Sequence, residues 1–290
     1  MISIIICSLH EKITESLVNN IESTIGIEHE IIFINNQKNQ FSIFQAYNIG
    51  VSKAKYPICC FMHDDIIYHS NNWGYILSQY FQNNVNLGIV AVAGCKYLRK
   101  MPSFWAISQY NAFNIIQSDK KNHSTTQVWN NLSKPENIIA FDGMWFCIRK
   151  SLFNIVKFDE KTYNGFHFYD LDIAMQTYIA NFQIQAIPDI LIEHTSLGNI
   201  NKEWLKNALL FYTKWHTYLP VSFINEDIKV LDKLEDIAII SFLRTIKNEK
   251  EYKLIIDWAK TAIDVKENFF RFLITLIQFG VNLLIKKKRK

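Results

Sequence analysis

Glycine and proline are scarce in this sequence: its 290 residues contain nine glycines and five prolines. The glycine fingerprints of P-loop and dinucleotide-binding proteins are both missing. The first apolar run is followed by Cys7-Ser8-Leu9-His10-Glu11, where a nucleotidyltransferase would usually carry a glycine-rich loop. These absences disfavour those classes of nucleotide-binding protein, and they also disfavour an architecture built mainly of turns.

Paired cysteines and a secretion signal are also missing. The sequence has five cysteines but no CxxC pair, and each lies in or beside an apolar run, at Cys7, Cys59, Cys60, Cys95 and Cys147. Such cysteines are typical of buried, reduced thiols in a reducing compartment. The N-terminus opens directly into the apolar run of residues 2–7, without the basic segment or cleavage site of a signal peptide. We therefore expect a cytoplasmic protein.

A basic surface is the third missing feature. The formal net charge is +4, but the last five residues, 286–290, are all basic. Removing these five from the 31 basic residues leaves 26, against 27 acidic residues. A nucleic-acid-binding protein usually spreads its basic residues along one face or groove. No nucleic-acid partner is therefore expected, and the hydrophobic share of 49% is enough for a substantial folded core.

The sequence does contain an alternation of two periodicities. Short β-branched runs occur at residues 2–7, 30–34, 58–62 and 89–93, and helix-length segments lie between them at residues 11–25, 41–55 and 73–84. Nearly continuous apolar strands separated by helices predict βαβ units with a parallel sheet buried on both faces. Right-handed crossovers then give a doubly wound α/β sheet whose ligands bind at the carboxyl ends of the strands.

This rhythm is lost at residues 95–136, which are rich in polar residues with aromatic residues between them. A stretch of that length without clear periodicity is usually functional or mobile. The pattern resumes with strands over 138–148 and 184–192 and a helix over 170–180, and only helical signals follow Asn199. We therefore expect an α/β domain over residues 1–198 and a helical region over 199–290.

The strongest local feature is a pair of adjacent carboxylates at a strand end. The apolar run 58–62 leads directly into His63-Asp64-Asp65, at the end of the strand where α/β sheets bind ligands. Two neighbouring carboxylates repel each other unless a cation lies between them and a ligand. Oxygen donors suit Mg²⁺ or Mn²⁺ that bridges to nucleotide phosphates. A solvated turn in which an aspartate caps a helix is the structural alternative.

The stretch that leads to these carboxylates resembles the family-2 glycosyltransferases of GT-A fold. Ala46-Tyr47-Asn48-Ile49-Gly50 is followed by Ala54, Pro57 and Phe61-Met62-His63-Asp64-Asp65, in the order and spacing of that family. The resemblance implies a mostly parallel, doubly wound sheet flanked by helices, with a helical C-terminal extension. It also implies transfer of a sugar from a nucleotide-diphosphate donor to a hydroxyl of a glycan or lipid-linked glycan, with inversion.

The resemblance covers residues 1–198 and implies a donor half over residues 1–94 and an acceptor half over 95–198. His63 stands where the family has the first aspartate of its Asp-x-Asp motif, so Asp65 is the implied ligand of Mn²⁺ or Mg²⁺. Two amides at the end of the second strand stand where many relatives place an aspartate that holds the base or ribose. The implied donor contacts are Asn35, Asn36, Asn48, His63 and Asp64.

A second pair of carboxylates, Asp170 and Asp172, opens the predicted helix 170–180. Acidic residues in a first helical turn are favoured by the dipole and by capping, which is the structural alternative. The position resembles the Glu-Asp element of the family, with Tyr169 in place of the glutamate. The resemblance implies that Asp170 is the base that removes the proton of the acceptor hydroxyl, and that Asp172 on the helix side is either structural or an acceptor contact.

Two further elements complete the resemblance. The ending His194-Thr195-Ser196-Leu197-Gly198 resembles that of relatives in which this histidine completes the metal or diphosphate site. The segment Phe141-Asp142-Gly143-Met144-Trp145 resembles the floor of the acceptor site, which implies acceptor contacts from Asp142 and from the Trp145 indole. A surface histidine and a core tryptophan are the structural alternatives.

The end of the chain has a pattern of its own. Polar residues at 268, 271, 275, 278 and 282 form one stripe of a predicted helix whose other positions are mostly Phe, Leu and Ile. An arginine and several amides argue against a spanning helix. A helix at a membrane surface, with the basic tail facing anionic lipid, fits better, and packing on protein is the alternative. We expect residues 268–290 to hold the protein peripherally at the cytoplasmic face of a membrane.

Two other functions stay open at this point. A metal-dependent phosphohydrolase or nucleotidyltransferase also uses aspartates at strand ends. A catalytically inactive relative would keep the fold as a binding or scaffold protein. The absent glycine-rich loop disfavours a nucleotidyltransferase, and the presence of Asp170 disfavours an inactive relative.

Overall fold

The computed structural model describes residues 1–101, 103–119, 124–196, 198, 200–257, 274 and 277. The chain divides into two compact units, of which unit 1 comprises residues 1–97 and 105–198 and unit 2 comprises residues 98–104 and 199–290. The predicted amphipathic helix over 268–285 and the basic tail lie outside the described residues, apart from two isolated positions.

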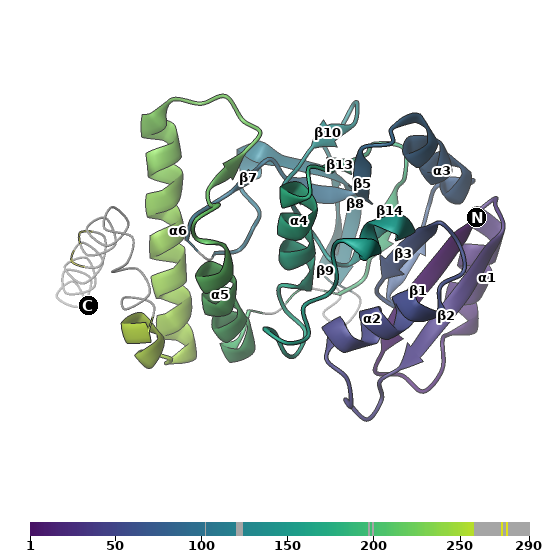
Figure 1. Cartoon of the computed structure of the whole chain (residues 1–290), viewed down its shortest axis with the longest axis horizontal. Helices are drawn as coiled ribbons and strands as arrows, with labels where there is room; N and C mark the ends of the chain where they lie inside the picture. Colours follow the sequence, from purple (N-terminus) through teal and green to yellow (C-terminus); the bar gives the residue numbers. More distant parts are fainter. Residues whose placement is uncertain are drawn as a thin grey trace. The chain divides into compact units, whose positions relative to one another are not determined.

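Unit 1 is built on a sheet with the strand order β10-β13-β5-β12-β3-β1-β2 (Figure 1). Its strands are β1 (Ile2–Ser8), β2 (His29–Asn35), β3 (Ile58–Met62), β5 (Leu87–Ala91), β10 (Glu136–Asn137), β12 (Trp145–Arg149) and β13 (Gln183–Ala186). β1 is parallel to β2 and β3, and β5 is parallel to β13, whereas β12 runs antiparallel between β3 and β5. The mostly parallel α/β sheet expected from the sequence is confirmed.

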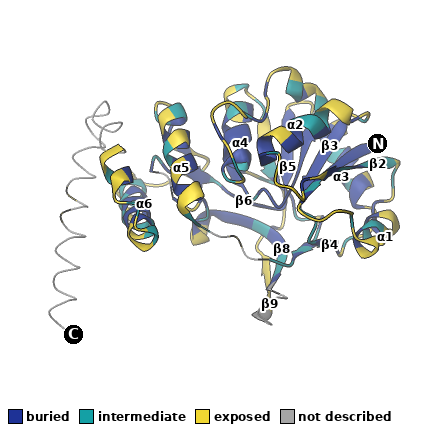
Figure 2. Cartoon of the chain, turned by 90° about the horizontal axis from the view of Figure 1, so that it is seen from below, coloured by how far each residue is buried: buried dark blue, intermediate teal, exposed yellow. Residues whose placement is uncertain are grey.

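Helices cover this sheet on both faces. They are α1 (Glu15–Thr24), α2 (Ile43–Lys53), α3 (Trp73–Asn83) and α4 (Tyr169–Ile179). Figure 2 shows α2 and α4 on one side of the sheet, and α1 with β4 and β8 on the other. Strand β3 is buried along its whole length, because a strand covered on both faces leaves none of its side chains in water. No disulfide joins the five cysteines, and all but Cys7 are buried.

A second sheet in unit 1 has the order β11-β6-β8-β14-β4, and β9 pairs with β8. Its strands are β4 (Ile66–Tyr68), β6 (Ala93–Cys95), β8 (Asn111–Asp119), β9 (Ser124–Asn130), β11 (Ala140–Phe141) and β14 (Ile192–His194). The stretch 95–136, which has no clear periodicity in the sequence, therefore contains a long β8–β9 hairpin. Its outer strand is exposed from Thr126 to Asn130, so it lacks the apolar run by which buried strands are found.

Two strands predicted as continuous are each broken in two. The segment 138–148 forms β11 and β12, separated by a turn in which Asp142 accepts a hydrogen bond from the Met144 backbone N–H at 3.0 Å. The segment 184–192 forms β13 and the start of β14, which belong to different sheets. Two short 3₁₀ helices, Ser108–Tyr110 and Lys150–Asn154, complete the regular structure of the described part of unit 1.

Unit 2 contains α5 (Lys202–Trp215) and α6 (Ile228–Glu249), as the helical signals after Asn199 predict. The expectation of helices alone is wrong for Val221–Ser222, which form the short strand β15. These two residues are too few to produce a periodic signal. Among the described residues, no helix combines the length and the apolar character that crossing a membrane requires.

Close packing of α2 on β1 depends on Gly50. A Cβ atom at this position would lie 2.3 Å from Cγ2 of Ile5, whose side chain is fully buried. We predict that Gly50→Ala lowers the free energy of unfolding by about 1–2 kcal/mol, because overpacking outweighs the higher helix propensity of alanine. Urea unfolding measures this, with Gly198→Ala as the control because nothing lies within 4 Å of that position. A Gly50→Ala variant as stable as the wild type would contradict the close contact.

Candidate metal centre and active site

The register of three strands brings the candidate residues together. Strand β3 ends at Met62, and the chain passes through residues 63–65 directly into β4. Because β14 pairs antiparallel with β4 so that His194 lies opposite Ile66, the ring of His194 comes beside Asp65. The backbone N–H of Thr195 donates to the carbonyl of Asp65 at 3.3 Å and fixes this approach.

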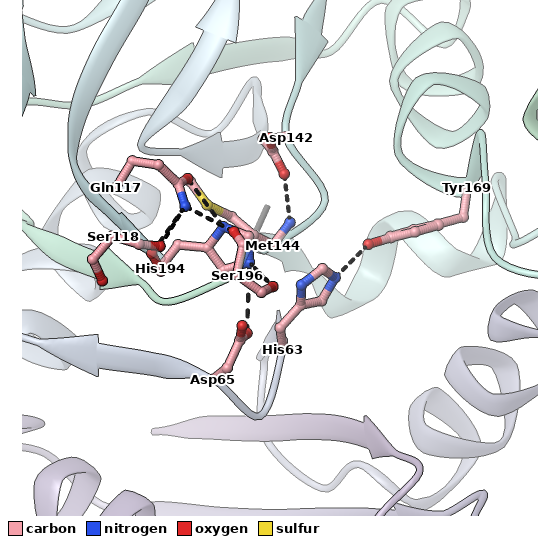
Figure 3. A network of polar contacts seen from close by, with 9 residues as sticks. All are labelled: His63, Asp65, Gln117, Ser118, Asp142, Met144, Tyr169, His194 and Ser196. Carbon is pink, nitrogen blue, oxygen red and sulfur yellow. Dashed lines mark hydrogen bonds and ion pairs between the residues drawn. The ribbon is translucent and has the colours of Figure 1, made fainter. Parts of the chain in front are cut away.

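His63, Asp65 and His194 form a compact cluster of side chains that can bind a metal (Figure 3). One ligand atom from each residue lies within 4.8 Å of the other two. Nε2 of His194 is 3.5 Å from Oδ1 of Asp65, and the two imidazole rings are 5.6 Å apart between centroids. His194 is only 6% exposed, whereas His63 and Asp65 are half-buried, so the cluster is open to solvent on one side.

The donor set fits a divalent transition metal. Two imidazoles and one carboxylate suit Mn²⁺ or a similar ion better than Mg²⁺, which prefers a shell of oxygen atoms. A histidine must be neutral to bind a metal, and burial together with the neighbouring His194 lowers the pKa of His63 below its ordinary value of 6.5. The structure therefore brings His63, expected from the sequence to contact the donor, into the same cluster as Asp65 and His194.

Tyr169, the first residue of α4, holds His63 from the other side. Its hydroxyl lies 3.1 Å from Nε2 of His63 (Figure 3). The other ring nitrogen, Nδ1, takes no part in this hydrogen bond. Gly143 allows the approach, since a Cβ atom there would lie 2.2 Å from the Tyr169 hydroxyl. The backbone N–H of His63 donates to the carbonyl of Met144 at 2.9 Å. The turn 142–144 and the start of α4 are thus tied to the cluster.

Asp170 lies next to this turn, and its carboxylate is held by backbone donors. Its two oxygens accept hydrogen bonds from the N–H groups of Leu171 at 2.8 Å and Gly143 at 3.1 Å. Burial, together with the nearby Asp142 carboxylate, nevertheless raises the pKa of Asp170 from 3.8 to about 7. A carboxyl group that titrates near neutrality can take up a proton at physiological pH. Asp142 is half-buried beside it.

Two of the residues expected to contact the donor, Asp64 and Asn35, lie at the carboxyl ends of strands. Asp64 accepts a short hydrogen bond from the Ser8 hydroxyl, which joins the carboxyl ends of β3 and β1. Asn35 is exposed at the end of β2 and bonds to the carbonyl of Glu11 at 3.0 Å. These side chains lie at the sheet edge where α/β proteins bind ligands.

Two expected donor contacts are engaged elsewhere. Asn36 is 5% exposed, and its amide donates to the carbonyl and accepts from the N–H of Phe41, at 2.8 and 3.0 Å, so it closes the loop before α2. Asn48 bonds to the carbonyl of Phe158 at 2.9 Å and to Glu160 at 3.2 Å, and it lines a shallow groove on α2 that contains none of the cluster residues. Both amides therefore have partners within the protein, and their contacts to the donor stay predictions.

The expectation that Trp145 stacks on an acceptor sugar is wrong. Its indole is 0% exposed, donates a hydrogen bond to the Tyr68 hydroxyl at 2.7 Å and packs edge-on against Trp73. Of the two roles expected for Asp172, the acceptor contact is wrong and the structural role fits, because this side chain is 1% exposed and accepts a hydrogen bond from Gln176 at 2.7 Å. Both residues stabilise the fold beside the site, and neither can touch an acceptor in this structure.

Sequence reasoning missed Gln117, the residue of β8 that lies opposite His194 in register. Its Oε1 atom is 3.2 Å from Nδ1 of His194. No motif surrounds Gln117, and it falls in the stretch 95–136 where no strand is predicted. Tyr169 is noticed in the sequence only as a replacement for a glutamate. Neither position carries a local signal, because both contacts depend on long-range packing.

The fold and the site together define a GT-A type α/β protein with a candidate metal centre at the carboxyl ends of its strands. Residues 3–209 match the glycosyltransferase-like family, and the chain belongs to this family. No curated protein matches the sequence.

The comparison with solved structures gives matches of low sequence identity. A crystal structure of GalNAc-T7 with UDP, GalNAc and Mn²⁺ superposes with a TM-score of 0.50 at 12% identity, over 85% of this chain and 56% of that one. This chain thus spans little more than half the length of that protein. The crystal structure of A197 from STIV matches with a TM-score of 0.40 at 10% identity, over 68% of this chain and 86% of that chain. The similarity to GalNAc-T7 supports the GT-A fold.

We predict that the stability gained by Asp170→Asn grows with pH. The folded protein holds a proton on Asp170 up to about pH 7, whereas the unfolded chain releases it near pH 4, so wild-type stability falls between these values. Asparagine does not titrate. One pKa unit corresponds to about 1.4 kcal/mol, and allowing for the part of the side chain that water reaches, we expect the variant to gain about 1–3 kcal/mol between pH 5 and pH 8.

Urea unfolding at pH 5 and pH 8, in buffer with a chelator, tests this prediction. Asp189→Asn, which removes an exposed carboxylate between β13 and β14, controls for the substitution itself. A stability difference between Asp170→Asn and wild type that is the same at both pH values would contradict the raised pKa.

Proposed function

We propose that this protein is a metal-dependent glycosyltransferase that moves a sugar from a nucleoside-diphosphate donor to an acceptor hydroxyl. The observation that supports this most is the cluster of His63, Asp65 and His194 at the carboxyl ends of the strands, beside the half-buried carboxyl of Asp170. Membership of the glycosyltransferase-like family supports it. The fold is shared with GalNAc-T7, whose crystal structure contains UDP, GalNAc and Mn²⁺.

The metal in this proposal is Mn²⁺, held by His63, Asp65 and His194. A divalent ion at this place neutralises the negative charge that develops on the leaving diphosphate. Asp64 is a proposed donor contact because it lies just after β3, and the Ser8 hydroxyl orients its carboxylate. Asn35 lies exposed at the neighbouring strand end, where a base or ribose can reach its amide.

Asp170 is the proposed base of a single displacement. The acceptor oxygen attacks the anomeric carbon, the bond from that carbon to the diphosphate oxygen breaks, and the Asp170 carboxylate takes the hydroxyl proton. The backbone N–H groups of Leu171 and Gly143 hold the carboxylate in place. Asp142, whose charge raises the pKa of Asp170, is the proposed acceptor contact. This stereochemical course inverts the configuration of the transferred sugar.

The acceptor proposal rests on the sequence. A glycan or lipid-linked glycan suits an enzyme placed at a membrane surface by residues 268–290, whose apolar and basic pattern favours peripheral binding. The proposed location is the cytoplasmic face of that membrane.

We predict Mn²⁺-dependent donor binding that requires Asp65. Calorimetry against UDP-, GDP-, CMP- and dTDP-sugars should find one donor that binds in Mn²⁺ and binds at least about 10-fold more weakly in Mg²⁺, because two ligands are imidazoles. Asp65→Asn should abolish the Mn²⁺-dependent part of the binding, because it removes the charged ligand. Asp189→Asn, an isosteric change away from the cluster, is the matched control and should bind as the wild type does.

Two results would count against this proposal. If a folded wild-type protein bound none of these donors, the chain would be better explained as a scaffold protein. If Asp65→Asn and Asp189→Asn bound the donor equally well, the cluster would not be the metal centre.

We predict that Asp170→Asn lowers turnover by about 10²- to 10⁴-fold while donor binding persists, because a general base contributes an effect of that size. The wild-type rate should rise with pH as the Asp170 carboxyl loses its proton around pH 7. Release of nucleoside diphosphate from the donor found by calorimetry measures both, with water or an added acceptor as the nucleophile. If Asp170→Asn kept both the rate and the pH profile of the wild type, Asp170 would be excluded as the base.

A further inference from the structure

The side chain of Gln117 makes four hydrogen-bonding contacts around His194. Its side-chain nitrogen Nε2 lies 2.7 Å from the carbonyl oxygen of Ser196, 3.0 Å from that of His194 and 3.1 Å from that of Ser118. Its oxygen Oε1 lies 3.2 Å from Nδ1 of His194. The half-buried amide thus links β8 both to the backbone that follows β14 and to the imidazole ring.

These contacts determine which way the amide points. Carbonyl oxygens accept hydrogen bonds and never donate them, so only the NH₂ end of the amide can face three of them. A flipped amide would place its own oxygen against those carbonyls. The oxygen of Gln117 therefore faces the His194 ring.

The amide orientation in turn determines the tautomer of His194. An amide oxygen can only accept, so Nδ1 of His194 carries the hydrogen. In the neutral ring, Nε2 then has a free lone pair. Nε2 lies 3.5 Å from Oδ1 of Asp65 and 3.4 Å from the Ser196 hydroxyl, on the side of the cluster (Figure 3). A lone pair and a carboxylate oxygen that face each other suit a shared cation.

We propose that Gln117 is a positioning residue that locks His194 as the Nδ1–H tautomer and so presents Nε2 to the divalent metal. This inference rests on the proposed function, because it assigns a role toward the same metal. Metal-binding histidines commonly donate their second N–H to such an outer partner, which fixes the ring and its basicity. Here the same amide also anchors the carbonyl of Ser196, so ring and strand end are held together.

The first test uses metal-free protein in which Gln117 is unchanged. Long-range ¹H–¹⁵N NMR on the metal-free wild type at pH 8 reports the protonated nitrogen of each imidazole, and loss of a signal in His194→Gln assigns His194. The expected result is a protonated Nδ1 and an unprotonated Nε2. An Nε2–H tautomer for His194 would overturn the inference, whatever the fate of any variant.

The second test measures Mn²⁺ affinity by calorimetry in Gln117→Leu. We expect binding about 10- to 100-fold weaker than in the wild type. The matched control is Gln127→Leu, which removes the exposed glutamine directly opposite Gln117 on β9 and should change the affinity by less than about 2-fold. Gln117→Glu keeps an acceptor for Nδ1–H but loses the donors to the three carbonyls.

These variants separate positioning from mere structural support. If Gln117 acts through the ring, Gln117→Glu binds Mn²⁺ more tightly than Gln117→Leu although it is no more stable to urea. Equal Mn²⁺ affinities in Gln117→Leu and Gln127→Leu would overturn the inference and leave the proposed function intact. Failure of the wild type to bind Mn²⁺ would instead overturn the proposed function.

Discussion

The pairing of β14 with β4 is the constraint on which the site depends. In this register His194 lies opposite Ile66, and the imidazole meets Asp65, which ends the turn after β3. A shift of one residue would turn His194 to the other face of the sheet. The parallel pairing of β14 with β8 fixes the same residue a second time, since Gln117 is its partner there. A three-residue strand thus fixes His194 of the candidate metal cluster between two neighbouring strands of one sheet.

Charge is divided between two places in the site. Asp65 faces two imidazoles and is suited to a cation, whereas Asp170 is half-buried near Asp142 and has its pKa raised to about 7. These different surroundings fit the two proposed roles, of Asp65 as a metal ligand and of Asp170 as a proton acceptor. Tyr169 and Gly143 connect the two places. The Tyr169 hydroxyl contacts His63 and lies close to Gly143, where a side chain would leave it no room.

The sheet and the strand-end carboxylates could be predicted from the sequence, because buried parallel strands produce unbroken apolar runs and polar residues follow each of them. The β8–β9 hairpin could not, since its outer strand is exposed and polar. The predicted acceptor contacts of Trp145 and Asp172 failed for a related reason. Sequence order places both next to the site, but only packing shows that their side chains point into the core. Gln117 lies far from His194 in sequence, so its contact appears only in the folded chain.

The proposed chemistry requires that His63, Asp65 and His194 bind one divalent metal. Anomalous diffraction at the manganese edge, from crystals grown with Mn²⁺ and a nucleoside diphosphate, tests it most directly. We expect a single strong peak about 2 Å from one ligand atom of each of the three residues, with the diphosphate on its open side. A peak coordinated by other residues, or a bound diphosphate with no metal peak beside these three, would contradict it.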